Sequence, residues 1–289
     1  MTTGTAEPVV RAQALLGECP LWDSSSQVLL WLDFRRQEVH LYEPATGVDR
    51  VVFVEPTPIS AMALRQQGGL VAAAGRGFVF FDPVSAKIEW IVNVEAGDRM
   101  NDGACDPAGR FLAGTMTFDR QRSAGLYRLD TDLSVHLVLA PVTVSNGLGW
   151  APNGRTFYYV DTPTCQVVAF DYDVTSGTIK NGRLFADLRQ VQGRPDGLTV
   201  DAAGHVWVAM FGGGAVRRYA PDGHFVQAVP IPTLHVTSCC FGGPDLQDLY
   251  VTSASRAMTD EQLASEPLAG AVFSIRTDAR GQQDRMFVG

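Results

Sequence analysis

The chain has 289 residues, of which 46% are hydrophobic and 19% are charged, and its formal net charge is −8. This is an ordinary globular composition, and its acidic balance argues against nucleic acid or an anionic membrane as a partner. No run approaches the roughly 18 apolar residues of a membrane span, and residues 1–10 lack the features of a signal peptide. Five cysteines without a CxxC pair favour reduced thiols in a cytoplasmic protein.

Short apolar or alternating runs bounded by Gly, Pro, Asn and Asp predict β-strands along the whole chain. They cover residues 28–33, 69–73, 78–81, 111–115, 156–160, 205–210 and 248–252. Residues 259–264 have a pattern compatible with one or two turns of helix. The sequence therefore predicts an all-β protein.

A longer period groups these strands, because similar turns between apolar strands recur every 41 to 50 residues. The turns lie near Ser26, Gly68, Gly109, Gly154, Gly204 and Gln247. Six units of this length, each with two hairpin signals, predict one domain, residues 1–289, folded as a six-bladed β-propeller with four-stranded blades. A sandwich would not need such a period. We expect residues 9–16 to complete the last blade beside residues 269–276, and the closed ring to be a monomer.

Polar residues recur at one position of the repeat, just before each turn. Glu18, Asn101, Asn146 and Asp196 share this position in four of the six units. In each blade, we expect the strand just before this turn to line the central channel. Burying carboxylate and amide groups there is costly unless they are hydrogen-bonded, paired or bound to a metal. Oxygen ligands suit Ca²⁺, Mg²⁺ or Mn²⁺, and the absence of His and Cys at this position argues against structural zinc.

A purely structural role is the alternative. The dipeptides at 102–103, 146–147 and 196–197 are Asp-Gly or Asn-Gly, which are common in turns. Recurrence at the same position favours a site. The chain has no GxSxG, HExxH or P-loop motif, and its five histidines are scattered. We interpret Asp33 and Asp161, which share a strand end, as structural.

Several segments in order resemble the senescence-marker protein/regucalcin/gluconolactonase family. They are GECPLW, RMNDGACDPAGRFLAGTM, SNGLGWAPNGRTFYYVDT, GRPDGLTVDAAGHVWVA and SCCFGGPDLQDLYVTSA. The resemblance covers about residues 16–273, and the closing ASEPLAGAVFSI looks most like bacterial sugar-acid lactonases of the xylonolactonase and arabinolactonase type. It implies a six-bladed propeller with one divalent metal ion (Ca, Mg, Mn, Zn or Fe) at the mouth of the channel.

The resemblance also implies roles for individual residues. Glu18, Asn146 and Asp196 match the metal ligands of the family, and Asp196 matches its general base. Arg99 and Asn101 match the residues that hold the oxygens of the substrate. Cys19 departs from the Ser or Gly of relatives, and the loop 117–123, which covers the site in the family, is shorter than in animal members. The substrate therefore cannot be carried over from those members.

These residues suit hydrolysis of a small sugar lactone to its acid. In this interpretation the metal polarises the carbonyl, Asp196 accepts a proton from water, and Arg99 faces the developing oxyanion. Hydrolysis of another ester or of a phosphotriester would use the same channel. A calcium-binding regulator, or a scaffold whose propeller face binds protein, is the alternative from another class, because fold alone does not fix function.

Overall fold

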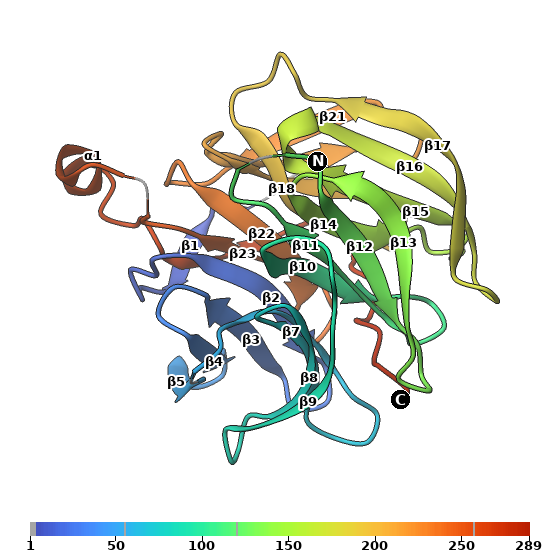
Figure 1. The fold of residues 1–289 in the computed structure, drawn as a ribbon. Coiled ribbons are helices and arrows are strands. Elements are labelled where there is room, and N and C mark those ends of the chain that lie inside the picture. Colours follow the sequence, from blue (N-terminus) through green and yellow to red (C-terminus); the bar gives the residue numbers. More distant parts are fainter. Residues whose placement is uncertain (1–3, 55, 120, 257) are drawn as a thin grey trace.

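A computed structural model describes residues 4–54, 56–119, 121–256 and 258–289 of the chain. The described residues form six antiparallel sheets of four strands each, arranged around a common centre (Figure 1). Hydrophobic residues of neighbouring sheets pack between the sheets and form the core. The predicted six-bladed propeller is therefore confirmed.

The first three blades follow the chain without interruption. Blade 1 consists of β2 (Gly17–Asp23), β3 (Val28–Asp33), β4 (Glu38–Glu43) and β5 (Val48–Phe53). Blade 2 consists of β6 (Ile59–Leu64), β7 (Leu70–Ala74), β8 (Gly77–Asp82) and β9 (Lys87–Asn93). Blade 3 consists of β10 (Arg99–Cys105), β11 (Phe111–Met116), β12 (Ala124–Leu129) and β13 (Val135–Val142).

The last three blades end with the closure of the ring. Blade 4 consists of β14 (Ser145–Trp150), β15 (Thr156–Asp161), β16 (Gln166–Asp173) and β17 (Thr178–Asp187). Blade 5 consists of β18 (Arg194–Val200), β19 (Val206–Phe211), β20 (Ala215–Tyr219) and β21 (Phe225–Pro230). Blade 6 consists of β22 (Val236–Gly242), β23 (Asp248–Ser253), β24 (Val272–Arg276) and, from the other end of the chain, β1 (Glu7–Val10).

Strand β1 closes the ring by antiparallel pairing with β24, in which Glu7 faces Ser274. The pairing of the two ends of the chain is as predicted, but the strand ends at Val10 rather than at residue 16. Because β1 covers the free edge of β24, the closure leaves no gap between first and last blade.

Helical structure is confined to two short segments of the described chain. Helix α1 (Asp260–Ser265) lies where the sequence predicted a turn or two, and Thr259 caps it in a capping box with Gln262. The 3₁₀ turn η1 (Thr162–Thr164) follows β15. Figure 1 shows α1 projecting from the ring. Neither helix has the length and apolar character needed to cross a membrane.

The first strand of each full blade, together with β22, forms the wall of the central channel. These inner strands are β2, β6, β10, β14, β18 and β22, and each contacts the next around the ring. Each inner strand carries a break in its pairing register, located near its start. Such β-bulges re-aim side chains locally, so all six blades change the direction of their side chains at the same level of the channel.

Candidate active site at the mouth of the channel

Four of the five predicted site residues, all except Arg99, lie at the bulges of the inner strands. Register shifts lie between Glu18 and Leu21 in β2, and between Asn146 and Leu148 in β14. Asn101 lies within the bulge of β10, as Asp196 does within that of β18. The Asp-Gly and Asn-Gly pairs therefore belong to bulged strands and not to turns. The repeat position recognised in the sequence is the bulge itself.

Glycines at these bulges are required because neighbouring blades approach closely. A Cβ on Gly147 would lie 2.7 Å from the backbone oxygen of Asp196, and one on Gly197 would lie 2.1 Å from the Ser238 hydroxyl oxygen. Gly147 also has φ of +23°. The glycines that follow Asn146 and Asp196 thus let neighbouring inner strands meet at the site.

All five predicted residues line one pocket of about 430 Å³ at the mouth of the channel. They are Glu18, Arg99, Asn101, Asn146 and Asp196. The volume lies within the range of ligand-binding clefts. Phe34, Phe118 and Phe211 supply apolar wall, so the pocket combines aromatic faces with a polar floor.

Hydrogen bonds fix the orientation of Asn146. Its amide nitrogen donates to the Thr162 hydroxyl at 2.8 Å, and that hydroxyl donates to the Pro195 carbonyl at 2.9 Å. The Asn101 amide donates to Oδ1 of Asn146 at 2.8 Å and to the Ser145 carbonyl. With its nitrogen engaged by Thr162, Asn146 presents Oδ1, which keeps a further lone pair, to the pocket.

Two buried aspartates hold the segments that lead into the site. Asp33 accepts hydrogen bonds from the backbone N–H groups of Leu15 and Leu16, just before β2. Asp161 accepts those of Thr143 and Val144, just before β14. The structural role predicted for both aspartates is confirmed, and each acts at the entrance to a strand that carries a candidate ligand.

The ionisable groups at the polar floor of the pocket have shifted pKa values. Burial, together with the negative charges of Asp196 and Asp102, raises the pKa of Glu18. Burial and then Asp102 raise the pKa of Asp196, which Arg99 opposes. Burial lowers the pKa of Arg99 to about 10, although Glu18 favours its charge. Carboxylates gathered in this way are stabilised by an added cation.

Asp102 is a third carboxylate at this floor, and the sequence interpretation missed it. It follows Asn101 inside the bulge of β10, and burial raises its pKa to about 6. A bulge breaks the alternation of side chains, so two consecutive residues can both face the channel. Adjacent polar residues at the repeat position were the only signal in the sequence.

The donor set suits a hard divalent ion. Glu18 and Asp196 offer carboxylate oxygens and Asn146 an oriented amide oxygen, which are the ligands that Ca²⁺, Mg²⁺ and Mn²⁺ prefer. Within the described ranges no three His, Cys, Asp or Glu side chains gather as a metal cluster, so the candidate oxygen donors include the amide of Asn146. No histidine lines this pocket.

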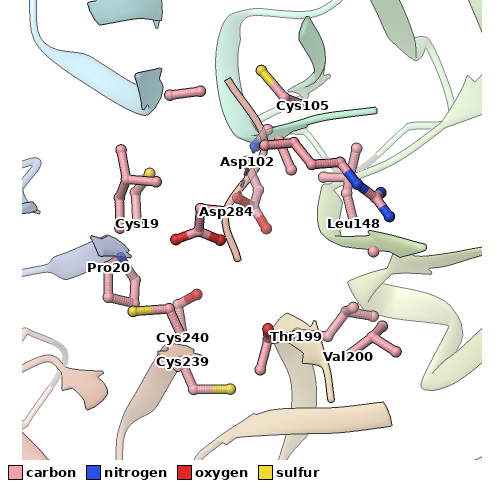
Figure 2. A pocket seen from close by; sticks show the side chains of 18 of the residues that line it. Cys19, Pro20, Asp102, Cys105, Leu148, Thr199, Val200, Cys239, Cys240 and Asp284 are labelled. Atoms are coloured by element: carbon pink, nitrogen blue, oxygen red, sulfur yellow. Dashed lines mark hydrogen bonds between the residues drawn. The ribbon is translucent and has the colours of Figure 1, made fainter. Parts of the chain in front are cut away.

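A second, inner cavity of about 130 Å³ continues the channel beyond Asp102, which lines both cavities. Figure 2 shows Asp102, Asp284 and four cysteines around it. The cysteines are Cys19, Cys105, Cys239 and Cys240. All four are free and buried, and burial raises the pKa of each thiol, to about 12 for Cys239. The four thiols are therefore neutral core groups.

Cys19 faces this inner cavity rather than the pocket. Its φ of +47° lies in the left-handed region, which explains why Gly is compatible with this position. Its sulfur accepts the Met62 N–H of the next blade at 3.2 Å. The thiol therefore ties blades 1 and 2 together directly behind Glu18.

The C-terminal tail covers the far end of the inner cavity, which no repeat pattern indicated. Hydrogen bonds join this segment, residues 280–288, to all six blades. The pairs are Trp22–Asp284, Leu64–Phe287, Gly109–Val288, Trp150–Gln282, Val200–Gln282, Ala202–Arg280 and Leu246–Gly281. The tail thus lies across the end of the channel opposite the pocket.

The loop 117–123 borders the pocket through Thr117 and Phe118. The Thr117 hydroxyl donates to the Gln121 carbonyl, and the N–H of Phe118 donates to Asp98. Phe118 is 67% exposed at the rim. Residue 120 of this loop lies outside the described residues.

The chain is similar to known proteins in both sequence and fold. The sequence signature of the SMP-30/Gluconolactonase/LRE-like region matches residues 16–255. Regucalcin of Danio rerio is 40% identical over 281 residues, 95% of either chain, and 6-deoxy-6-sulfogluconolactonase of Pseudomonas putida is 37% identical over 291 residues, 99% of either chain. The crystal structure of a calcium-binding protein, regucalcin, from Agrobacterium tumefaciens superimposes with a TM-score of 0.93 at 27% identity, covering 98% of this chain and 97% of that one. The chain belongs to the SMP-30/gluconolactonase/LRE-like family.

Proposed function

We propose that this protein hydrolyses a sugar lactone to the corresponding sugar acid, with one divalent cation held by Glu18, Asn146 and Asp196. The observation that carries the proposal is the convergence of bulged inner strands on one pocket, where these oxygens lie beside Arg99 and Asn101. Relatives named as lactonases, including the Pseudomonas putida enzyme, support the reaction class. The substrate would be a small molecule, and no other partner is needed.

Lactone hydrolysis joins a water oxygen to the carbonyl carbon and breaks the bond from that carbon to the ring oxygen. A bound divalent ion would polarise the carbonyl and make a nearby water more acidic. Asp196, buried at the floor of the pocket, would accept the proton of the attacking water. The ring oxygen then leaves as a hydroxyl after taking up a proton, and the product is the acid.

The remaining side chains would position the substrate. Arg99 lies with its guanidinium 4.3 Å from the ring centre of Phe34, and its Nη1 donates to the Met100 carbonyl. These contacts hold a fixed positive charge beside the floor, where it would stabilise the oxyanion. The Asn101 amide carries both a donor and an acceptor, which suits the hydroxyl groups of a sugar.

Metal-stripped protein tests the proposal directly. Xylono-, arabino-, galactono- and gluconolactone would be supplied with Ca²⁺, Mg²⁺, Mn²⁺, Zn²⁺ or Fe²⁺ added back, and acid release would be followed. We expect metal-dependent hydrolysis of at least one lactone. Absence of any metal-dependent rate would overturn the proposal.

A calcium-binding role without catalysis is the second candidate, because the Agrobacterium tumefaciens structure is described as a calcium-binding protein and the donor set here consists of oxygens. That role predicts tight Ca²⁺ binding with no turnover of any lactone. The same assay, combined with a Ca²⁺ titration, separates the two functions.

A further inference from the structure

The rim of the pocket is basic although the whole chain carries a formal net charge of −8. Arg194 and Arg256 line the pocket together with Arg99. Arg35 lies near enough to lower the pKa of both Arg99 and Arg256, after the larger effect of burial on each. Three guanidinium groups therefore line one opening, and that of Arg35, which follows the lining residue Phe34, lies near two of them.

These arginines are not engaged in structural ion pairs. Within the described ranges, none of the four has a carboxylate oxygen within 4 Å, whereas seven other arginines of the same chain do. Two aspartates near the loop 117–123 accept backbone N–H groups rather than pairing with these arginines, since Asp98 accepts from Phe118 and Asp119 from Gln121. The charge of the rim is thus available to a ligand.

The backbone holds each of these side chains at the same end of the channel. Arg99 and Arg194 are the first residues of inner strands β10 and β18. The N–H of Arg35 donates to the buried Asp33, and the N–H of Arg256 donates to the Leu15 carbonyl. Like charges are costly to hold together, and the carboxylates at the floor would be neutralised by the proposed divalent ion, so an anion bound at the rim would relieve the repulsion between the arginines.

A neutral lactone would not require this arrangement. Arg99 alone faces the floor, where Glu18 and Asp196 attract it. The other three arginines, Arg35, Arg194 and Arg256, lie toward the outside, and all three are exposed. Guanidinium groups bind carboxylate, phosphate and sulfonate oxygens in bidentate fashion, and partial burial strengthens such contacts.

We infer that the preferred substrate is an anionic sugar lactone, whose carboxylate, phosphate or sulfonate group lies against Arg35, Arg194 and Arg256 while its lactone carbonyl faces the floor of the pocket. This inference rests on the proposed lactonase function. It assigns a binding role to three residues for which the sequence analysis had none. It also explains why an acidic protein keeps a basic opening, since such an opening attracts an anion from solution.

The test compares kcat/KM for neutral glucono-1,5-lactone with that for two charged lactones, glucaro-1,4-lactone and 6-phosphoglucono-1,5-lactone. We expect at least one charged lactone to be preferred about tenfold or more, and the preference to shrink between 20 mM and 500 mM salt through screening. The carboxylate and phosphate arms identify the anionic group. Equal or better hydrolysis of the neutral lactone overturns the inference, whereas no hydrolysis of any lactone overturns the proposed function itself.

Substitution of single arginines tests whether the preference for charged lactones comes from the rim of the pocket. In Arg256→Gln and Arg194→Gln we expect the ratio of charged to neutral kcat/KM to fall about three- to tenfold each. Arg50→Gln removes an exposed arginine from β5, on the outside of blade 1, and should leave the ratio unchanged. A ratio that stays the same in both rim variants would exclude these arginines as the anion site.

Discussion

At the outer end of the central channel, Glu18, Asn146 and Asp196 face a pocket that a ligand can enter. Further along the same inner strands, Cys19, Cys105 and Cys239 line a cavity that the C-terminal tail covers. The strands, their neighbours and their bulges are shared, yet one end gathers oxygen donors and the other gathers neutral thiols. Even consecutive residues of one strand can line different cavities, since Glu18 lines the pocket and Cys19 lines the inner cavity.

The comparison shows what the bulge contributes. In a regular strand consecutive side chains alternate between faces, so Asn101 and Asp102 would point apart. In the bulge of β10 Asn101 lines the pocket, while Asp102 lines both cavities. The propeller brings the inner strands together around the channel, and the bulges set the position along the channel at which side chains change direction. The residue types at that position then determine whether it forms a polar site or part of the core.

The largest expected effect comes from removing the carboxylate of Asp196. Asp196→Asn keeps the shape and one oxygen ligand but can no longer accept a proton. We expect kcat for lactone hydrolysis to fall about 10³-fold at saturating metal, with the melting temperature little changed. Activity near that of the wild type would remove Asp196 as the base.

At the end of the channel covered by the C-terminal tail, substitutions should mainly affect the stability of the fold. Phe287 is fully buried, packs on the hydrophobic core of blades 2 and 3, and lies in the tail that joins all six blades. Phe287→Ala should cost about 3 kcal/mol and lower the melting temperature by about 5–10 °C. Val288→Ala, which truncates a neighbour that is 40% exposed, serves as control and should have little effect. Equal melting temperatures in both variants would contradict the role given to the tail.

A smaller effect is expected when the orientation of the candidate metal ligand Asn146 is disturbed while the residue itself is kept. Thr162→Val removes the hydroxyl that accepts from the Asn146 amide, without touching Asn146 itself. We expect divalent-metal affinity to fall about tenfold, as for other residues that orient metal ligands. Thr164→Val, which removes a hydroxyl bonded to the Asp161 carbonyl, is the matched control. Isothermal titration of both variants decides, and identical affinities would exclude the orienting role.

The smallest effect concerns Asp284 in the inner cavity. Burial raises its pKa to about 6, so the native state binds its proton more tightly than the unfolded chain does. Its contribution to stability is therefore fully present below about pH 4 and is lost as the pH rises through 6. Asp284→Asn should gain about 1–2 kcal/mol over the wild type at pH 8 and keep only about half of that gain at pH 5. Denaturant unfolding at both pH values measures this, and a pH-independent difference would contradict it.

Much of the fold follows from sequence periodicity. Strand β3 covers residues 28–33 as predicted, and the turn at Gly154 separates β14 from β15. Pairing of the chain ends was also predictable, although β1 ends six residues earlier than expected. The tail was not predictable, because its contacts depend on backbone groups and on single side chains such as Gln282, which leave no repeat in the sequence.

The candidate site was only partly predictable. Glu18, Asn101, Asn146 and Asp196 stood out because the repeat aligned them, and the resemblance to a family added Arg99. Asp102, Thr162 and Arg256 did not stand out, because each reaches the pocket through a local break in regular structure. Asp102 lies in a bulge, Thr162 in the turn after β15, and Arg256 in the segment after β23. Such positions follow from three-dimensional packing and not from a period.

The most direct test of the account is the stoichiometry of divalent metal that lactone hydrolysis requires. Metal-stripped protein would be titrated with the ion that best restores activity, while bound metal and the initial rate of acid release are measured on the same samples. The account predicts that the rate rises with occupancy and saturates at one ion per chain, and that Glu18→Ala combined with Asp196→Ala abolishes both. Full hydrolysis by metal-stripped protein, or one tightly bound ion in the double variant, would contradict it.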